Sequence, residues 1–295
     1  MSALAISCPS TSKARGRPLG ATALAIRSAV HDLTDTYERM TVRQVFYALE
    51  VAEIVEKTEA GYRQVQAQVL RMRREGLLSW EFITDGTRWQ RKPESFDTVE
   101  DAMTMMARTY RRDLWQAQDM RIEVWLEKDA LADIVTGVTD EWDVSLMVSR
   151  GQSSATFLWR AAMAAQAAWT QMGVATFIYA LYDRDAGGRR AARTIERDLP
   201  GHAPGVPIHF TLLGVTDEQV EAWDLPTRPA KQSDPEADKF DGRAVELDAI
   251  PPDRLIGLVE NAIMGHVDAR AWGIEQAVER EEREVLLRLA GEAAA

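Results

Sequence analysis

The amino-acid sequence predicts an α/β protein in which a largely helical N-terminal domain precedes a mostly parallel sheet with C-terminal helices. Apolar residues at helical spacing dominate the first part of the chain. From Arg121 onward, short β-type runs alternate with helical patterns, which is typical of βαβ units. Two of these runs, RIEVWLEKDAL at 121–131 and TFIYALYDRDAGGRR at 176–190, end in acidic residues. The sequence therefore places acidic groups at strand ends, where open α/β sheets bind ligands.

Composition narrows the class of protein. The chain has 295 residues, enough for two modest domains, and its 46% hydrophobic and 27% charged content is ordinary for a globular protein. The single cysteine, Cys8, excludes an intramolecular disulfide and a thiolate zinc site. No apolar run approaches the ~18 residues that span a bilayer, and the N-terminus does not resemble a secretory signal. We expect a cytoplasmic protein without a membrane partner.

The net charge of −11 is unevenly distributed. The first 120 residues carry 17 Lys+Arg and 16 Asp+Glu, a net +1, and the rest carry 18 and 30, a net −12. Basic clusters occur at 13–17, 63–74 and 108–112. An acidic total weakens non-specific DNA binding but still permits a basic groove on one face.

The chain begins with a predicted disordered basic tail over residues 1–20. This segment contains Arg15-Gly16-Arg17-Pro18, the core of an AT-hook-like peptide that inserts arginines into the A·T minor groove. A plain solvated tail is the alternative, and we favour it because four residues are a weak match.

A winged-helix DNA-binding domain is predicted for residues 21–118. The helical patterns cover 21–40, 41–52, 59–75 and 98–118, the last as a connecting helix. Thr41 and Gln44 fit a capping box that opens the second helix, and Gly76 stops the third. The run LLSWEFITDGTRWQRK alternates and turns at Asp85-Gly86, as a β-hairpin wing does. The alternative is a small helical domain with a solvated basic face.

The third predicted helix supplies candidate DNA contacts. Val65, Val69 and Met72 form its apolar side. Three arginines fall elsewhere on this helix and are assigned to DNA phosphates: Arg63, Arg71 and Arg74.

The second domain is predicted to cover residues 119–295. Strands are expected at about 122–126, 143–148, 175–182 and 207–213, and helices at about 128–138, 153–171, 187–198, 253–267 and 274–289. Residues 224–245 are rich in Pro, Asp and Lys and are expected to form a loop.

Three carboxylates are candidate metal ligands. Glu127 follows the first strand, and Asp183 and Asp185 follow the third. Strand periodicity predicts that the two aspartates point the same way. Oxygen ligands without Cys or His suit Mg²⁺, with Mn²⁺ also acceptable. The alternative is that these acids are solvated strand ends.

Four further polar residues lie near the predicted strand ends or just after the sheet. Lys128 follows Glu127 and is assigned either to a substrate phosphate or to the surface, and Arg150 follows the second strand and is a candidate phosphate ligand. Glu246 and Asp248 either add a metal ligand or cap the following Pro-Pro segment.

The segments EVWLEKDAL, VSRGQSS and ALYDRDAGG resemble the Toprim domain in order and spacing. The flanking sequence resembles the A subunit of topoisomerase VI and the related meiotic double-strand-break transesterase, with single-chain mini-A proteins of phages and mobile elements most similar. The resemblance covers about residues 35–265 and implies a winged-helix domain followed by a Toprim domain of Rossmann-like fold.

This resemblance implies a nucleophile and an oligomeric state. Arg43-Gln44-Val45-Phe46-Tyr47 is similar to the Arg-x-x-Tyr-Tyr segment of the family, which puts Tyr47 at the nucleophile position and Phe46 in place of the first tyrosine. Arg43, one helical turn earlier, is positioned to assist. Homodimers of the family bring the tyrosine of one subunit to the metal of the other. Read from the residues alone, Tyr47 could instead be a core tyrosine.

We therefore expect a Mg²⁺-dependent, nucleoid-associated protein that cleaves double-stranded DNA as a homodimer through a tyrosyl–DNA phosphodiester. The sequence has no GxxxxGK phosphate loop, so strand passage coupled to ATP would require a separate ATPase subunit. Two alternatives remain open. One is a Toprim nuclease that uses metal-activated water, and the other is a non-catalytic DNA-binding regulator.

Overall fold

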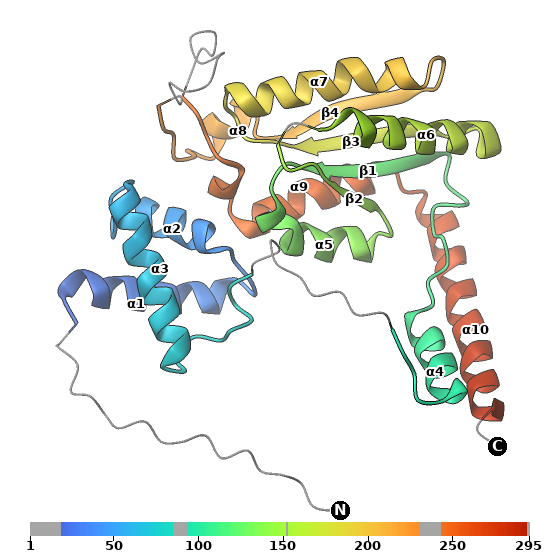
Figure 1. Cartoon of the computed structure of the whole chain (residues 1–295), viewed down its shortest axis with the longest axis horizontal. Coiled ribbons are helices and arrows are strands. Elements are labelled where there is room, and N and C mark those ends of the chain that lie inside the picture. The colour runs from blue at the N-terminus through green and yellow to red at the C-terminus, as the bar shows by residue number, and fades with distance from the viewer. Residues whose placement is uncertain (1–18, 85–93, 152, 230–242, 294–295) are drawn as a thin grey trace, which may run out of the picture.

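A computed structural model describes residues 19–84, 94–151, 153–229 and 243–293. Within this part of the chain, three N-terminal helices lie beside an α/β unit, and a pair of helices from distant parts of the sequence runs along its other end (Figure 1). The predicted N-terminal tail with its AT-hook-like peptide lies outside the described residues, apart from its last two positions, and so does the Asp85-Gly86 turn.

The sheet has four parallel strands in the order β2-β1-β3-β4. Their bounds are β1 Met120–Leu126, β2 Ser145–Val148, β3 Ala175–Leu181 and β4 Ile208–Gly214. The predicted parallel sheet and all four of its strands are thus confirmed. The last residue of β1, Leu126, is in register with Val148 and with Leu181, the last residues of β2 and β3. Three strands therefore end at one level, and the residues that follow them share one edge of the sheet.

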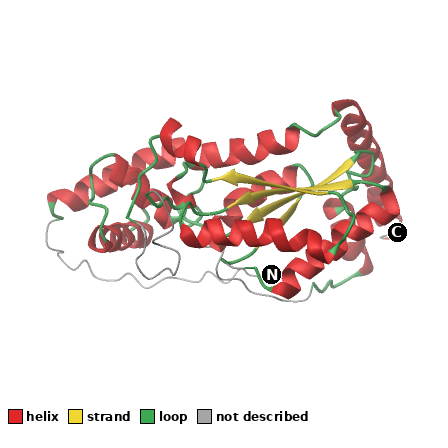
Figure 2. Ribbon diagram, turned by 90° about the horizontal axis from the view of Figure 1, so that it is seen from above, coloured by secondary structure: helices red, strands yellow, loops and turns green. Residues whose placement is uncertain are grey.

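Helices cover both faces of the sheet (Figures 1 and 2). Helices α5 (Ala132–Glu141) and α9 (Pro252–Met264) pack on the face that carries Val124 and Leu126. Helices α6 (Ala155–Met172) and α7 (Ala186–His202) pack on the face that carries Trp125 and Ile178. Alternating residues of β1 thus enter different cores, as the side-chain period of a strand requires.

The three N-terminal helices form where the sequence predicts them. They are α1 (Ala21–Thr36), α2 (Val42–Val51) and α3 (Glu59–Arg74). The capping box is confirmed, because Thr41 Oγ1 accepts from the Gln44 backbone N–H and Gln44 Oε1 accepts from the Thr41 backbone N–H. Gly76 has a φ of +74°, which suits the glycine at the end of α3.

Helix α1 ends four residues before its predicted limit. The Met40 backbone N–H donates to the Phe82 carbonyl at 2.9 Å, and the Thr84 N–H donates to the Met40 carbonyl at 3.0 Å. These two bonds require an extended backbone at Met40, so the helix must end earlier. Residues 77–84 are the described part of the predicted wing. Their β-type pairing is the isolated bridge between Ile83 and Met40.

The connecting helix is shorter than predicted. Helix α4 covers Val99–Thr109 and packs along α10, which covers Ala269–Ala293. Arg283 of α10 donates two hydrogen bonds to the Tyr110 carbonyl, and Arg112 forms ion pairs with two glutamates of α10. These side chains hold the segment after Thr109 in an irregular conformation that helical periodicity did not anticipate.

Two short elements were not predicted. Helix α8 (Asp217–Ala222) begins with a second capping box, formed by Thr216 and Gln219. A 3₁₀ turn, η3, covers Leu247–Ala249. The segment that carries Glu246 and Asp248 directly follows the loop predicted at 224–245.

The N-terminal helices share a hydrophobic core with one side of the α/β unit. Buried residues of α1–α3, including Ile26, Val45 and Val65, belong to the same connected cluster as Val124 of β1 and Leu255 of α9. The predicted domain boundary after residue 118 stays a prediction.

Candidate functional site at the carboxyl edge of the sheet

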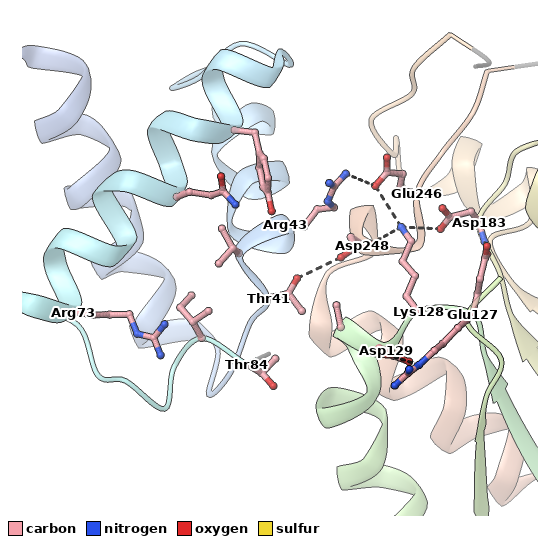
Figure 3. Close-up of a pocket in the computed structure, with 16 residues that line it drawn as sticks. Thr41, Arg43, Arg73, Thr84, Glu127, Lys128, Asp129, Asp183, Glu246 and Asp248 are labelled. Carbon is pink, nitrogen blue, oxygen red and sulfur yellow. Dashed lines mark hydrogen bonds and ion pairs between the residues drawn. The ribbon is translucent and has the colours of Figure 1, made fainter. Parts of the chain in front are cut away.

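A cleft of about 760 Å³ separates the N-terminal helices from the carboxyl edge of the sheet. One wall carries Thr41 and Arg43 from the start of α2 and Arg73 from α3, and the other carries Lys128 and Asp183 from the ends of β1 and β3 (Figure 3). Carboxyl edges of parallel strands are the usual position of binding sites in α/β folds, so this cleft is the candidate functional site.

The parallel pairing of β1 and β3 brings Glu127 and Asp183 together. The Glu127 backbone N–H donates to the Leu181 carbonyl at 3.0 Å, which continues the strand ladder by one residue. Glu127 Oε2 then accepts from the Asp183 backbone N–H at 2.9 Å. A Cβ at Gly188 would collide with the Asp183 backbone, so glycine is needed there for α7 to approach the loop. The predicted proximity of these two acids is confirmed.

Asp185 does not join them in the way that strand periodicity predicts. Strand β3 ends at Leu181, and Asp185 is the N-cap of α7, with Oδ1 accepting from the Gly188 backbone N–H at 2.9 Å. Its Oδ2 pairs with Arg228 at 3.2 Å. The expectation that Asp183 and Asp185 point the same way relied on a strand continuing through both, and the strand does not.

Two acids from the segment after the sheet complete the site. Arg184 and Val245 form an antiparallel bridge, which ties this segment to the loop after β3. The Leu247 backbone N–H donates to Asp183 Oδ1 at 2.8 Å. Glu246 and Asp248 are therefore buried beside Asp183 and are part of the site, although they lie far from it in the sequence.

Lys128 lies at the centre of this acidic group. Its Nζ is 3.1 Å from Asp183, 3.3 Å from Glu246 and 2.7 Å from Asp248. Burial alone would lower the pKa of Lys128, but the three carboxylates raise it, so the ammonium stays charged. Lys128 is therefore not a solvated surface lysine, and its contact with a phosphate stays a prediction.

Glu246 connects the two walls of the cleft. Its Oε2 pairs with Arg43 Nη1 at 2.7 Å, and its Oε1 pairs with Arg228 Nε at 3.3 Å. Burial would raise the pKa of Glu246, but Lys128, Arg43 and Arg228 hold this pKa at about 2. Thr41 adds a weaker link, at 3.4 Å to Asp248. The segment that contains RQVFY therefore contacts the acidic edge directly, where the acidic edge is the group Glu127, Asp183, Glu246 and Asp248.

Among the described residues, no ion pair neutralises Glu127 as Lys128, Arg43 and Arg228 neutralise Glu246. Burial and the nearby charge of Asp183 raise the pKa of Glu127 to about 7. Repulsion between two carboxylates is the condition that a divalent cation relieves, and their oxygens are the donor type that Mg²⁺ prefers. In the part of the chain that the structure describes, no three acidic, His or Cys side chains are spaced as ready-made metal ligands. Two of the predicted ligands are instead ion-paired, Asp183 with Lys128 and Asp185 with Arg228.

Tyr47 lies next to the acidic cleft but outside it. Its side chain is only 5% exposed and packs against Phe46, with ring centroids 5.5 Å apart. It lines a neighbouring cavity of about 240 Å³ together with Gln44 and Asp248. Burial and the charge of Glu246 raise the pKa of Tyr47 above that of a free tyrosine. In this conformation the hydroxyl is protonated, and Tyr47 is not among the residues that line the acidic cleft.

The predicted DNA-binding arginines divide into two groups. Arg150 lines the cleft and pairs with Asp129 at 2.6 Å. Arg63 is paired with Glu59 on the exposed side of α3, and Arg71 and Arg74 are exposed outside the cleft. Their contact with DNA stays a prediction.

The polar site residues that sequence reasoning missed include Tyr62, Gln66, Arg73, Asp129 and Arg228. Three of them share one face of α3, and the spacing 62, 66 and 73 would have revealed this face. Asp129 and Arg228 become visible only in the folded chain.

The fold and site together define an α/β protein with a parallel sheet and an acidic, lysine-containing cleft at its carboxyl edge. No protein family model matches the chain, and no curated protein matches its sequence significantly. Across the described helices, none is both long enough and apolar enough to cross a bilayer.

Proposed function

We propose that this protein is a Mg²⁺-dependent DNA-cleaving protein of the topoisomerase VI A-subunit type, which forms a tyrosyl–DNA phosphodiester through Tyr47. One observation carries the proposal. The helix that contains Arg43 and Tyr47 is paired through Arg43 and Glu246 with the edge that carries Glu127, Lys128 and Asp183. Two sequence segments assigned to one reaction therefore meet in space.

The proposed assignment of the fold follows the same resemblance. Helices α1–α3 and the segment after α3 correspond to a winged-helix domain, and β1–β4 with their helices correspond to a Toprim domain. The three helices, the parallel sheet and the acids after β1 and β3 support this assignment.

The reaction is a transesterification. The Tyr47 oxygen attacks phosphorus, the bond from phosphorus to the 3′ oxygen breaks, and the 3′ oxygen takes up a proton while the tyrosine proton leaves to a base. Because the pKa of Tyr47 is raised, the hydroxyl needs cationic assistance. Arg43 and Lys128 lower this pKa, and the Lys57 ammonium lies 5.2 Å from the ring centre.

Mg²⁺ would be held by Glu127 and Asp183, with Asp185 as a further ligand. Once bound, it supplies charge stabilisation for the phosphodiester that is cleaved. Lys128 and Arg150, which both line the cleft, are positioned to contact the phosphate from the side of the sheet.

A homodimer is part of the proposal. Tyr47 does not line the acidic cleft of its own chain, and the resemblance implies that the tyrosine of one subunit meets the metal of the other. A separate ATPase subunit would be needed only if cleavage is coupled to strand passage.

The second candidate is a nuclease that uses metal-activated water. The burial of Tyr47 favours it, because a 5% exposed hydroxyl with a raised pKa is poorly placed to attack DNA. The acidic edge alone is sufficient for this chemistry.

A covalent-adduct assay tests the proposal. DNA incubated with protein and Mg²⁺ is quenched with denaturant, and protein-linked ends and free breaks are counted for wild type, Tyr47→Phe and Tyr37→Phe. Tyr37 is a matched control because it lines the same cavity as Tyr47. We expect Tyr47→Phe to lose adduct and breaks together and Tyr37→Phe to keep both. Breaks without adduct in every variant would establish the nuclease instead.

A further inference from the structure

The acidic cleft has a second wall whose role the proposed reaction leaves open. Tyr62, Gln66 and Arg73 of α3 line it opposite Lys128 and Asp183. At 3.6 residues per turn, positions 62, 66 and 73 return to within about 40° of one another, so they form one stripe along the helix. Gln64 and Arg74 lie on other sides of α3 and do not line the cleft.

Arg73 differs from the other cations of the cleft. Arg43 is paired with Glu246, Arg150 with Asp129, and Lys128 with three acids. The Arg73 side chain instead donates to the Trp80 carbonyl at 2.5 Å and lies over the Trp80 ring at 4.2 Å. Its Nε is buried without a hydrogen-bond partner among the described residues. A guanidinium that is held in place and carries no carboxylate partner is prepared for an anionic ligand.

Tyr62 and Gln66 extend this surface. The Arg43 guanidinium lies 5.0 Å from the centre of the Tyr62 ring, and Phe46 packs edge-on against that ring at 5.4 Å. These two contacts hold the Tyr62 ring where the stripe on α3 meets Arg43, which is itself paired with Glu246 of the acidic edge. Gln66 is exposed and lines the cleft between Tyr62 and Arg73.

We propose that the stripe Tyr62–Gln66–Arg73 binds the DNA backbone and holds it against the acidic edge, with Arg73 contacting a phosphate. The proposal rests on the proposed function for the identity of the ligand. It replaces Arg71 and Arg74 by Arg73 as the arginine of α3 that DNA contacts. The acidic wall alone would repel DNA, so a cationic wall opposite it is needed to retain the backbone in the cleft.

Duplex binding measured by fluorescence anisotropy across a salt series, with EDTA present, tests the proposal without cleavage. Gln66→Glu places a negative charge in the cleft and should weaken binding about tenfold, whereas Gln64→Glu makes the same change outside it and should leave binding unchanged. Arg73→Ala should flatten the salt slope by ~0.9, the loss of one phosphate contact, and Arg74→Ala should not.

Equal weakening of duplex binding by Gln66→Glu and Gln64→Glu would overturn the proposal. A change in the salt slope of Arg74→Ala without a change in that of Arg73→Ala would also overturn it. The glutamine pair keeps the test valid if Arg73→Ala fails to fold, because both glutamines are exposed. If the variants bind DNA as expected but the wild type never cuts DNA in Mg²⁺, the proposed function is refuted and the assignment of the stripe as a DNA contact is kept. A wild type that binds no DNA would refute both.

Discussion

Arg43 and Glu246, 203 residues apart in the chain, form an ion pair of 2.7 Å and both line the cleft. The pair joins the helix carrying Tyr47 to the segment carrying Asp248. Because Glu246 is also bound by Lys128 and Arg228, its charge is neutralised from both walls.

We expect Arg43→Ala and Glu246→Gln to be coupled. A double-mutant cycle by chemical denaturation should give an interaction free energy of about 1 kcal/mol, because each change removes the partner of the other. The matched pair for comparison is Arg63 and Glu59, which are both exposed and should couple by only a few tenths of a kcal/mol. Strict additivity of Arg43→Ala and Glu246→Gln would show that this contact is not formed in solution.

Lys128→Met should destabilise the protein by roughly 2–4 kcal/mol, because Asp183, Glu246 and Asp248 then lose the ammonium between them. Mg²⁺ should recover part of this loss, and the melting temperature should rise more with Mg²⁺ in the variant than in the wild type. The control is Lys57→Met, whose ammonium bonds a carbonyl rather than acids, so that variant should gain nothing from Mg²⁺. An equal response to Mg²⁺ in both variants would contradict the cation-accepting role of the site.

Glu127 should make stability depend on pH in a specific direction. Its pKa is raised from 4.5 to about 7 in the folded state, so the unfolded chain loses its proton first as pH rises. The wild type therefore loses stability between about pH 4.5 and 7 relative to Glu127→Gln, and the difference is constant above 7. Thermal melts of both proteins across this range measure it. A variant that is less stable than the wild type at pH 8 would show that Glu127 is not repelled in the folded state.

Asp185 combines a structural role with its proposed metal role. Asp185→Ala should cost about 1 kcal/mol of stability, because α7 loses the side chain that caps it at Gly188. Asp185→Asn keeps the cap, so it should melt close to the wild type while binding Mn²⁺ more weakly in a calorimetric titration. Equal loss of stability in the two variants would mean that the ion pair with Arg228, rather than the cap, is the important contact.

A feature of this fold could be predicted from the sequence when the residues that form it lie close together in the chain. The four strands, the main helices and the capping box of Thr41 and Gln44 depend on local patterns, and the structure confirms them. Glu127 and Asp183 were predicted to meet because parallel strands that end in register bring their next residues together. These features are set by periodicity over a few residues.

Contacts between distant segments were not accessible in the same way. The short α1 depends on the pairing of Met40 with the chain around Ile83, and the early end of α4 depends on arginine and glutamate contacts with α10. Two of the three partners of Lys128, Glu246 and Asp248, come from a segment more than 100 residues later, so its central position could not be read from its neighbours. The strand periodicity used for Asp183 and Asp185 does not apply, because β3 ends at Leu181 and Asp185 caps α7.

Strand cleavage by wild type and Asp183→Asn, each with Mg²⁺ and with EDTA, tests the central claim most directly. Asparagine keeps an oxygen that can accept from the Leu247 backbone N–H, so the fold should survive while the negative charge is lost. We predict breaks only for the wild type with Mg²⁺, and at least a hundredfold fewer for Asp183→Asn at equal protein concentration, consistent with loss of metal-assisted charge stabilisation. Cleavage by a folded Asp183→Asn protein at the wild-type rate would contradict the assignment of this acidic edge as the site of DNA cleavage.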